Sequence, residues 1–202
     1  SATGGGSATG GGAPEVPISF SNCPTFTPCL TVIPMNGPLT YVGACIDTTE
    51  QQRYADFFDR NCGTGSTFLA NWTGTIRGTT DFSTTTVTRD VESTLNFTAF
   101  ITGANCSGTT GCAAVQTAVT QSFGFTGTCN SSGSTCTCTL SRTIADQTTE
   151  QMTVNQTNIE LPTSGRLFDT CGSSGGIRYR ERAPTDPLQV PEIGIYTLTP
   201  FP

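Results

Sequence analysis

Hydrophobic and polar residues alternate along most of the chain after residue 67. In STLNFTAFI the apolar positions fall at every second residue, at Leu95, Phe97, Ala99 and Ile101. The longer run AVQTAVTQSFGFTGTC places Val115, Val119, Phe123, Phe125 and Cys129 on the odd positions. A period of two is typical of a strand with one buried face. The pattern therefore predicts long strands, including one over residues 114–129.

Turn-forming clusters separate these runs at spacings typical of hairpins, at GANCSGTTGC, CNSSGST, PTSG and CGSSGG. Only one segment shows a helical pattern: near residues 48–60, Tyr54, Phe57 and Phe58 form an apolar stripe, and Gly63 follows it. Many strands with one helix predict an all-β fold. We expect an antiparallel meander that forms a lipocalin-like barrel or sandwich.

The first 38 of the 202 residues differ in composition from the rest. Residues 1–14 hold SATGGG twice and predict a flexible tether. Residues 15–38 are rich in proline and predict an extended segment, because proline is tolerated mainly at strand edges. Residues 39–202 are expected to form a single β domain. The tether leaves room for a membrane anchor through a lipidated cysteine upstream of residue 1.

Charge and residue types exclude several functions. The net charge of −6 argues against nucleic-acid binding, which needs a basic surface. The sequence has neither histidine nor lysine, so it offers no Ser-His-Asp triad, no Schiff-base lysine and no histidine metal site. The acidic residues show no pair with the pattern of a glycosidase. We expect a protein that is not an enzyme and needs no cofactor or metal.

One cluster of cations remains as a candidate binding site. In IRYRER, alternation puts Arg178, Arg180 and Arg182 on one face of a strand, opposite Ile177, Tyr179 and Glu181. The three arginines could contact an anion or an acidic glycan. They could equally keep the outer face of a sheet edge soluble.

Ten cysteines without histidine predict five disulfides and an oxidising compartment. In STCTCTL, a strand would place Cys136 and Cys138 side by side on its apolar face, where they are poorly placed to bond each other. Proximity and hairpin geometry suggest a pairing scheme, which sequence alone does not prove. The scheme is Cys129–Cys136, Cys106–Cys112, Cys23–Cys29, Cys45–Cys62 and Cys138–Cys171.

The order of these motifs resembles a known family. The chain contains, in order, a strand ending in Cys45, threonine-rich strands, a Cys-loop-Cys, TCTCTL, a Cys-bearing stretch and a terminal YTLTP. This order is similar to that in the cysteine- and threonine-rich, lipocalin-like lipoproteins of myxobacteria and related bacteria. The similar region runs from about Gly43 to Pro200. The resemblance implies a lipocalin-like meander and a location at the outer membrane or cell surface. It transfers no catalytic residue.

Three functions fit these observations. The first is a secreted or surface-tethered β module with a structural or binding role at the cell envelope. The second is a subunit of an extracellular filament, in which EVPISF adds as a strand to a neighbour's open sheet edge. The third is a carrier that holds an apolar ligand inside the barrel. We expect the first function. The alternative is the second, in which copies of the protein associate with one another.

Overall fold

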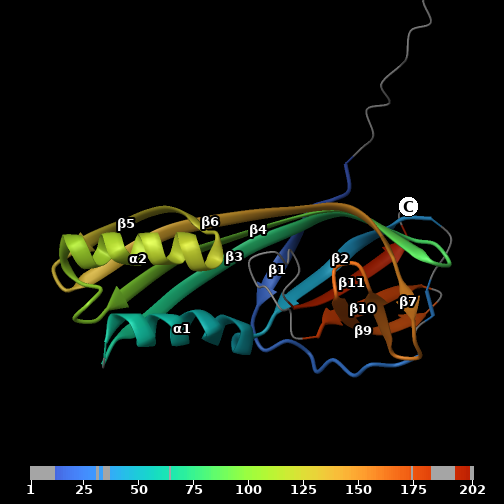
Figure 1. Ribbon diagram of the computed structural model, residues 1–202, viewed down its shortest axis with the longest axis horizontal. Helices are drawn as coiled ribbons and strands as arrows, with labels where there is room; N and C mark the ends of the chain where they lie inside the picture. Colours follow the sequence, from blue (N-terminus) through green and yellow to red (C-terminus); the bar gives the residue numbers. More distant parts are fainter. Residues whose placement is uncertain are drawn as a thin grey trace, which may run out of the picture.

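The computed structural model, shown in Figure 1, describes residues 12–30, 32–33, 37–63, 65–173, 175–182 and 194–200. Over these residues the chain is mostly β-structure, which confirms the predicted all-β class. It also contains two helices, and the first of them is the predicted helix. Residues 1–11 of the expected tether lie outside the described residues. In chain order the elements are β1 (Val16–Phe20), β2 (Leu39–Ile46), α1 (Thr48–Cys62), β3 (Thr67–Phe82), β4 (Thr86–Thr102), α2 (Gly108–Phe123), β5 (Thr126–Ser132), β6 (Thr135–Gln151), β7 (Thr153–Val154), β8 (Asn158–Leu161), β9 (Arg166–Ser173), β10 (Gly176–Glu181) and β11 (Ile195–Pro200).

Three long strands, β3, β4 and β6, form a ribbon along the length of the molecule (Figure 1). β3 and β4 pair without interruption from Thr67 opposite Thr102 to Phe82 opposite Val87. β4 pairs with β6 over its whole length in the same way. The two helices lie along one end of this ribbon, and the shorter strands β2 and β7 to β11 lie at the other end. Along the long strands, successive side chains point alternately to a buried inner face and to an outer face rich in threonine.

All eleven strands belong to one sheet, in the order β5-β6-β4-β3-β1-β2-β11-β10-β9-β8-β7. The pairings are antiparallel except for β1 with β2, which is parallel. Over the described residues the sheet does not close, because β5 and β7 are its two edges. The predicted lipocalin-like closure is therefore wrong. The physical reason is strand length: β3, β4 and β6 have 16 or 17 residues, whereas β7 to β11 have two to eight and cover only one end of the ribbon.

Aromatic side chains fill the space between the helices and the ribbon. The ring of Tyr54 on α1 lies 4.8 Å from the rings of both Trp72 and Phe123. The rings of Phe97 and Phe125 are also 4.8 Å apart, in an edge-to-face arrangement that aromatic pairs favour. The apolar stripe of α1 thus packs into the core of this end.

The second helix, α2, overturns the strand predicted over residues 114–129. Val115 and Val119 are four residues apart, which suits a strand of period two and equally one face of a helix. The structure buries them together with Cys112, at positions i, i+3 and i+7 of the helix. Gly124 ends the helix in the left-handed conformation, and its N–H donates to the carbonyl of Thr120. The later odd positions, Phe125 and Cys129, belong to the chain that follows this turn.

Replacing Gly124 with Ala should lower the free energy of unfolding by about 1–2 kcal/mol, because φ is 66° there and a Cβ disfavours that conformation. Gly43→Ala is the control. The new Cβ would make only van der Waals contacts at either position, and Gly43 has no positive φ. Denaturant unfolding of both variants would measure the difference. Equal losses would contradict the assignment of the cost to the backbone.

The proline-rich segment before residue 39 enters the main sheet. β1 lies between β2 and β3, where Ile18 pairs opposite Ala44 and Val16 opposite Ile76. Ile18 is buried in the core. Three residues after β1, Cys23 forms a disulfide with Cys45 of β2. The segment expected to add to a neighbour's sheet therefore forms a strand of its own sheet.

The structure pairs all ten cysteines, but in none of the predicted combinations. The pairs are Cys23–Cys45, Cys29–Cys171, Cys62–Cys106, Cys112–Cys136 and Cys129–Cys138. The β5–β6 hairpin turns after Ser132, which pairs with Thr135, so Cys129 lies opposite Cys138 rather than Cys136. Helix α2 then brings Cys112 to Cys136. The prediction that Cys136 and Cys138 are buried side by side and bond other partners is confirmed.

Five disulfides indicate an oxidising, extracellular-type environment. Neither of the described helices has both the length and the apolar character that a membrane span requires.

Candidate functional site

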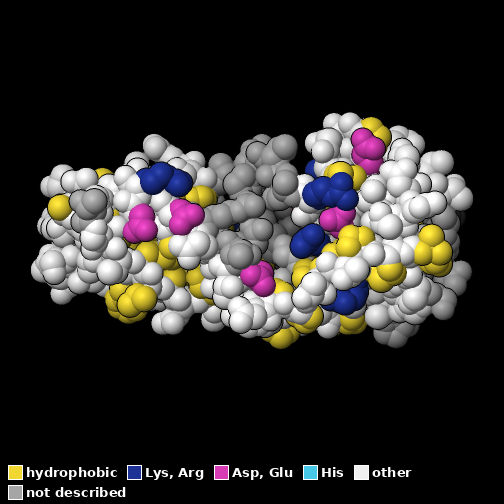
Figure 2. Space-filling model, turned by 90° about the horizontal axis from the view of Figure 1, so that it is seen from below, with side chains coloured by type: hydrophobic (Ala, Val, Ile, Leu, Met, Phe, Trp, Pro, Cys, Tyr) yellow, Lys and Arg dark blue, Asp and Glu magenta, His cyan; other side chains and the backbone are white. Residues whose placement is uncertain are grey.

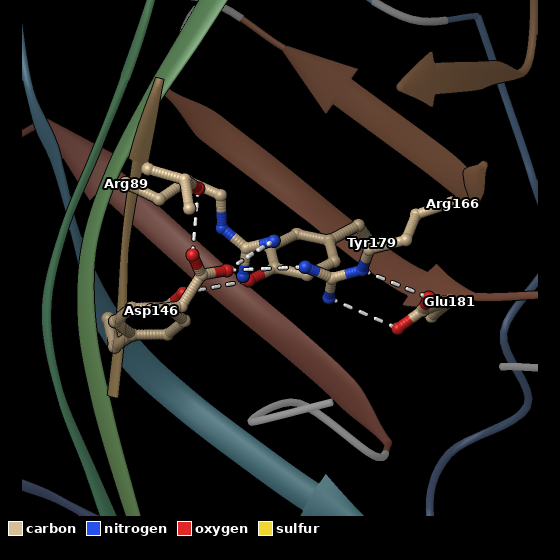
Figure 3. A network of polar contacts seen from close by, with 7 residues as sticks. Arg89, Asp146, Arg166, Tyr179 and Glu181 are labelled. Carbon is tan, nitrogen blue, oxygen red and sulfur yellow. Dashed lines mark hydrogen bonds and ion pairs between the residues drawn. The ribbon is translucent and has the colours of Figure 1, made fainter. Parts of the chain in front are cut away.

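Four charged side chains meet between the ribbon and the C-terminal strands (Figure 3). Arg166 of β9 lies between two carboxylates: its Nη1 is 3.2 Å from Oδ2 of Asp146, and its Nε and Nη2 each donate to Glu181 at 3.1 Å. Arg89 of β4 lies on the other side of Asp146, with its Nη1 3.4 Å from Oδ2. All four side chains are at most 13 % exposed. We call Arg89, Asp146, Arg166 and Glu181 the ionic network.

The ionic network carries two positive and two negative charges, so they compensate one another. Burial lowers the pKa of Arg166, but its hydrogen bond to Glu181 and the nearby carboxylates outweigh this and leave the pKa raised. The guanidinium of Arg166 also lies 4.8 Å from the centre of the Phe168 ring, a distance suited to a cation–π contact. The network thus links the β4–β6 pair of strands to the β9–β10 pair. Among the described residues, no strand of the first pair is hydrogen-bonded to a strand of the second.

Three buried tyrosines lie beside the ionic network. The hydroxyls of Tyr41 and Tyr179 are 2.9 Å apart, and the ring of Tyr179 stacks on Tyr196. Burial raises the pKa of Tyr41, and the neighbouring Tyr179 adds to that effect. Burial also raises the pKa of Tyr196, and it raises that of Tyr179 to about 12. These hydroxyls therefore stay protonated at neutral pH and act as hydrogen-bonding groups.

A small cavity of about 30 Å³ adjoins these residues. Its polar lining comes from Thr80, Arg89, Thr170 and Tyr179, and the other lining residues are apolar. A volume of this size holds about two water molecules. Ligand sites of drug-sized molecules need several hundred cubic ångströms. The cavity is too small to hold such a ligand.

Alkaline pH should destabilise the protein through Tyr179. In an unfolded chain its pKa returns to the model-peptide value of 10.0, so above pH 10 the unfolded chain loses this proton while the folded chain keeps it. The contribution of Tyr179 is fully present below pH 10 and is lost as pH rises to about 12. The expected slope is about 1.4 kcal/mol per pH unit for this residue. Denaturant unfolding between pH 9 and 11 should give a shallower decline for Tyr179→Phe, and an equal decline would contradict the assignment.

Of the three arginines singled out from the sequence, Arg178 and Arg180 lie on the outer face of β10, as alternation predicts, and the exposed Arg182 follows directly after the strand. Arg180 Nη2 is 3.4 Å from Oδ2 of Asp169, and Arg182 pairs with the same carboxylate. The hydrogen bond to Asp169 raises the pKa of Arg182. The guanidiniums of Arg178 and Arg180 lie 5.8 and 5.6 Å from the ring centre of Phe26. The arginines are brought together, but a buried acid and an aromatic ring already engage them.

Sequence reasoning missed the ionic network, although a signal for it exists. Arg89 shares the inner register of β4 with Val87 and Val91, and Asp146 shares that of β6 with Cys138 and Leu140. A charged residue in the apolar register of an alternating strand predicts a buried ion pair, since an isolated buried charge is too costly. The partners could not be found this way, because the pairing of β4 with β6 and the approach of Arg166 and Glu181 from β9 and β10 arise only in the tertiary structure.

The fold and these contacts define a class of protein: a disulfide-rich, all-β module with a packed, charge-compensated interior. Comparison with known proteins finds no matching family model, no matching curated protein and no matching solved structure. The resemblance to the myxobacterial lipoproteins therefore stays a prediction from sequence.

Proposed function

We propose that this protein is a non-enzymatic module, secreted or tethered at the cell surface, with a structural or binding role at the cell envelope. The observation that carries this proposal is the distribution of its disulfides. They connect the N-terminal segment to β2 and β9, α1 to the turn before α2, and α2 and β5 to β6. Such cross-links form and persist in oxidising compartments, where they stabilise the folded chain by restricting the unfolded one.

The surface supports the same proposal. Figure 2 shows few charged side chains on the face seen from below, and most of that face is uncharged. On the outer face of the ribbon, threonine hydroxyls contact one another across strands, at 2.7 Å for Thr67 with Thr102 and 3.0 Å for Thr94 with Thr143. Threonine hydroxyls therefore supply much of the polarity of this face, beside the ion pair of Arg77 with Glu92.

The two alternative functions receive less support. A carrier of an apolar ligand needs an interior volume of several hundred cubic ångströms, and the cavity beside the ionic network has about 30 Å³. A filament built by strand addition needs a free N-terminal strand. β1 pairs on both sides in its own sheet, and the Cys23–Cys45 disulfide ties the chain three residues beyond it.

Fractionation of the source cells tests the proposal. Immunodetection should find the protein in the envelope fraction or the medium, and mapping of unreduced peptides should find every cysteine oxidised. A cytosolic protein with free thiols would contradict the proposal. A ladder of assemblies that disappears when residues 1–20 are deleted, while the monomer stays folded, would favour the filament instead.

A further inference from the structure

Four cysteines from three elements converge between α2 and the β5–β6 hairpin. Two disulfides, Cys112–Cys136 and Cys129–Cys138, lie side by side, and the Sγ atoms of Cys136 and Cys138 are 3.8 Å apart. The Sγ atoms of Cys129, Cys136 and Cys138 all lie within 4.8 Å of one another. Within the described part of the chain, no other set of three or more Cys, Asp or Glu side chains brings its ligand atoms so close.

The separation of the Cys136 and Cys138 sulfurs suits a tetrahedral metal site. Zinc binds thiolate sulfur at about 2.3 Å, which places the four sulfurs of a tetrahedral site about 3.8 Å apart. The Sγ atoms of Cys136 and Cys138 already have this separation. Opening the two S–S bonds requires each bonded pair of sulfurs to move apart by about 2 Å, which rotation about the side-chain bonds can supply.

The elements that present these cysteines are held together by contacts other than the disulfides. β5 pairs with β6 over seven residue pairs. The Gln116 side chain of α2 accepts a hydrogen bond from the backbone N–H of Cys129 at 2.9 Å. At the other end of α2, Nη1 of Arg142 donates to the carbonyl of Phe123 at 3.1 Å. The four sulfurs therefore keep a common scaffold when the S–S bonds are absent.

We propose that, when reduced, Cys112, Cys129, Cys136 and Cys138 bind one Zn²⁺ ion as a four-thiolate site. Each disulfide takes two electrons and two protons from a dithiol, which is itself oxidised to a disulfide. The four thiols then release four protons as they bind the ion. Cys129 lies half-buried on the edge strand β5, so the Cys129–Cys138 bond is the first that a reductant reaches. Exchange with two disulfide molecules, each of which is reduced to a dithiol, restores both bonds and releases the Zn²⁺ ion.

This inference is independent of the envelope role. It gives the hairpin and α2 two alternative cross-links, disulfides in an oxidising compartment and a zinc ion in a reducing one. Zinc fits the all-sulfur ligand set, because tetrahedral four-thiolate sites are typical of structural zinc.

The test uses the full chain, reduced with a phosphine, loaded with Zn²⁺ and then exposed to a competing chromophoric chelator. Native mass spectrometry should find one zinc ion per wild-type chain. The variant Cys112→Ser/Cys136→Ser should bind zinc roughly 100-fold or more weakly, since it lacks two ligands. Cys62→Ser/Cys106→Ser, which lacks another disulfide that includes buried cysteines, should retain one ion.

Alkylation of the zinc-loaded wild-type chain locates the ligands without relying on any variant. Peptide mapping should find Cys112, Cys129, Cys136 and Cys138 protected and the other six cysteines modified. Loss of all zinc to the chelator, protection of a different set of cysteines, or equal retention by both variants would each overturn the proposal. A reduced chain that unfolds would lose its zinc to the chelator or show protection of a different set of cysteines, so unfolding also counts against the proposal.

Discussion

Replacing Arg166 with Met should lower the free energy of unfolding by about 3–5 kcal/mol, the cost of removing one partner from a buried ion pair. Arg166 holds Glu181 through two hydrogen bonds and Asp146 through one, and the two carboxylates are 4 % and 11 % exposed. Without the guanidinium, the negative charge of Glu181 stays buried but loses the positive charge that compensates it. Denaturant unfolding with the disulfides intact would measure the loss.

Arg77→Met is the matched control for this prediction. Arg77 pairs with Glu92 at 2.7 Å on the outer face of the ribbon, where the side chains are 56 % and 38 % exposed. Solvent screens such a pair, so its loss should cost at most about 1 kcal/mol. If the two variants lose the same small amount, the ionic network does not have the stabilising role assigned to it.

Removing the Cys29–Cys171 disulfide by Cys29→Ala/Cys171→Ala should cost about 4–5 kcal/mol. This bond joins residues 142 positions apart, and in the chain-entropy model a longer closed loop restricts the unfolded chain more. It also fixes the proline-rich segment to β9, where the N–H of Cys29 donates to the carbonyl of Thr170 at 3.0 Å. The unfolding free energy of this variant, with the other four disulfides verified by mass spectrometry, gives the measurement.

Cys23→Ala/Cys45→Ala controls for the loss of a disulfide as such. Its cysteines are also half-buried, but they are only 22 positions apart, so the expected cost is smaller, at about 3.4 kcal/mol. A loss at Cys29–Cys171 no greater than at Cys23–Cys45 would show that loop length does not govern the stability of this protein.

The parts of the fold that local patterns control were predictable. The strand over residues 93–101 and the helix near residues 48–60 each have a period that fits only one element. The alternation in IRYRER correctly separates the outward arginines from inward Tyr179 and Glu181. The prediction failed for α2, where two valines four residues apart satisfy both periods and a short sequence cannot decide between them.

The candidate site was less predictable because its contacts join distant segments. Arg89 and Asp146 meet across neighbouring strands, but Arg166 and Glu181 come from strands further along the chain. Disulfide pairing failed for a similar reason. The scheme joined cysteines mainly by proximity in sequence, whereas α2 brings Cys112 over β6 and the hairpin register shifts the partner of Cys129 by two residues.

The sequence by itself determined the β class, the oxidised state expected of its cysteines and the buried position of Cys136 and Cys138. Each of these follows from residue type and a short period along the chain. Only the tertiary structure decided that the sheet stays open, that β1 lies within it, and that four charges and four sulfurs meet in two separate clusters. Those features depend on which strands become neighbours, and that is settled by the joint packing of segments far apart in the chain.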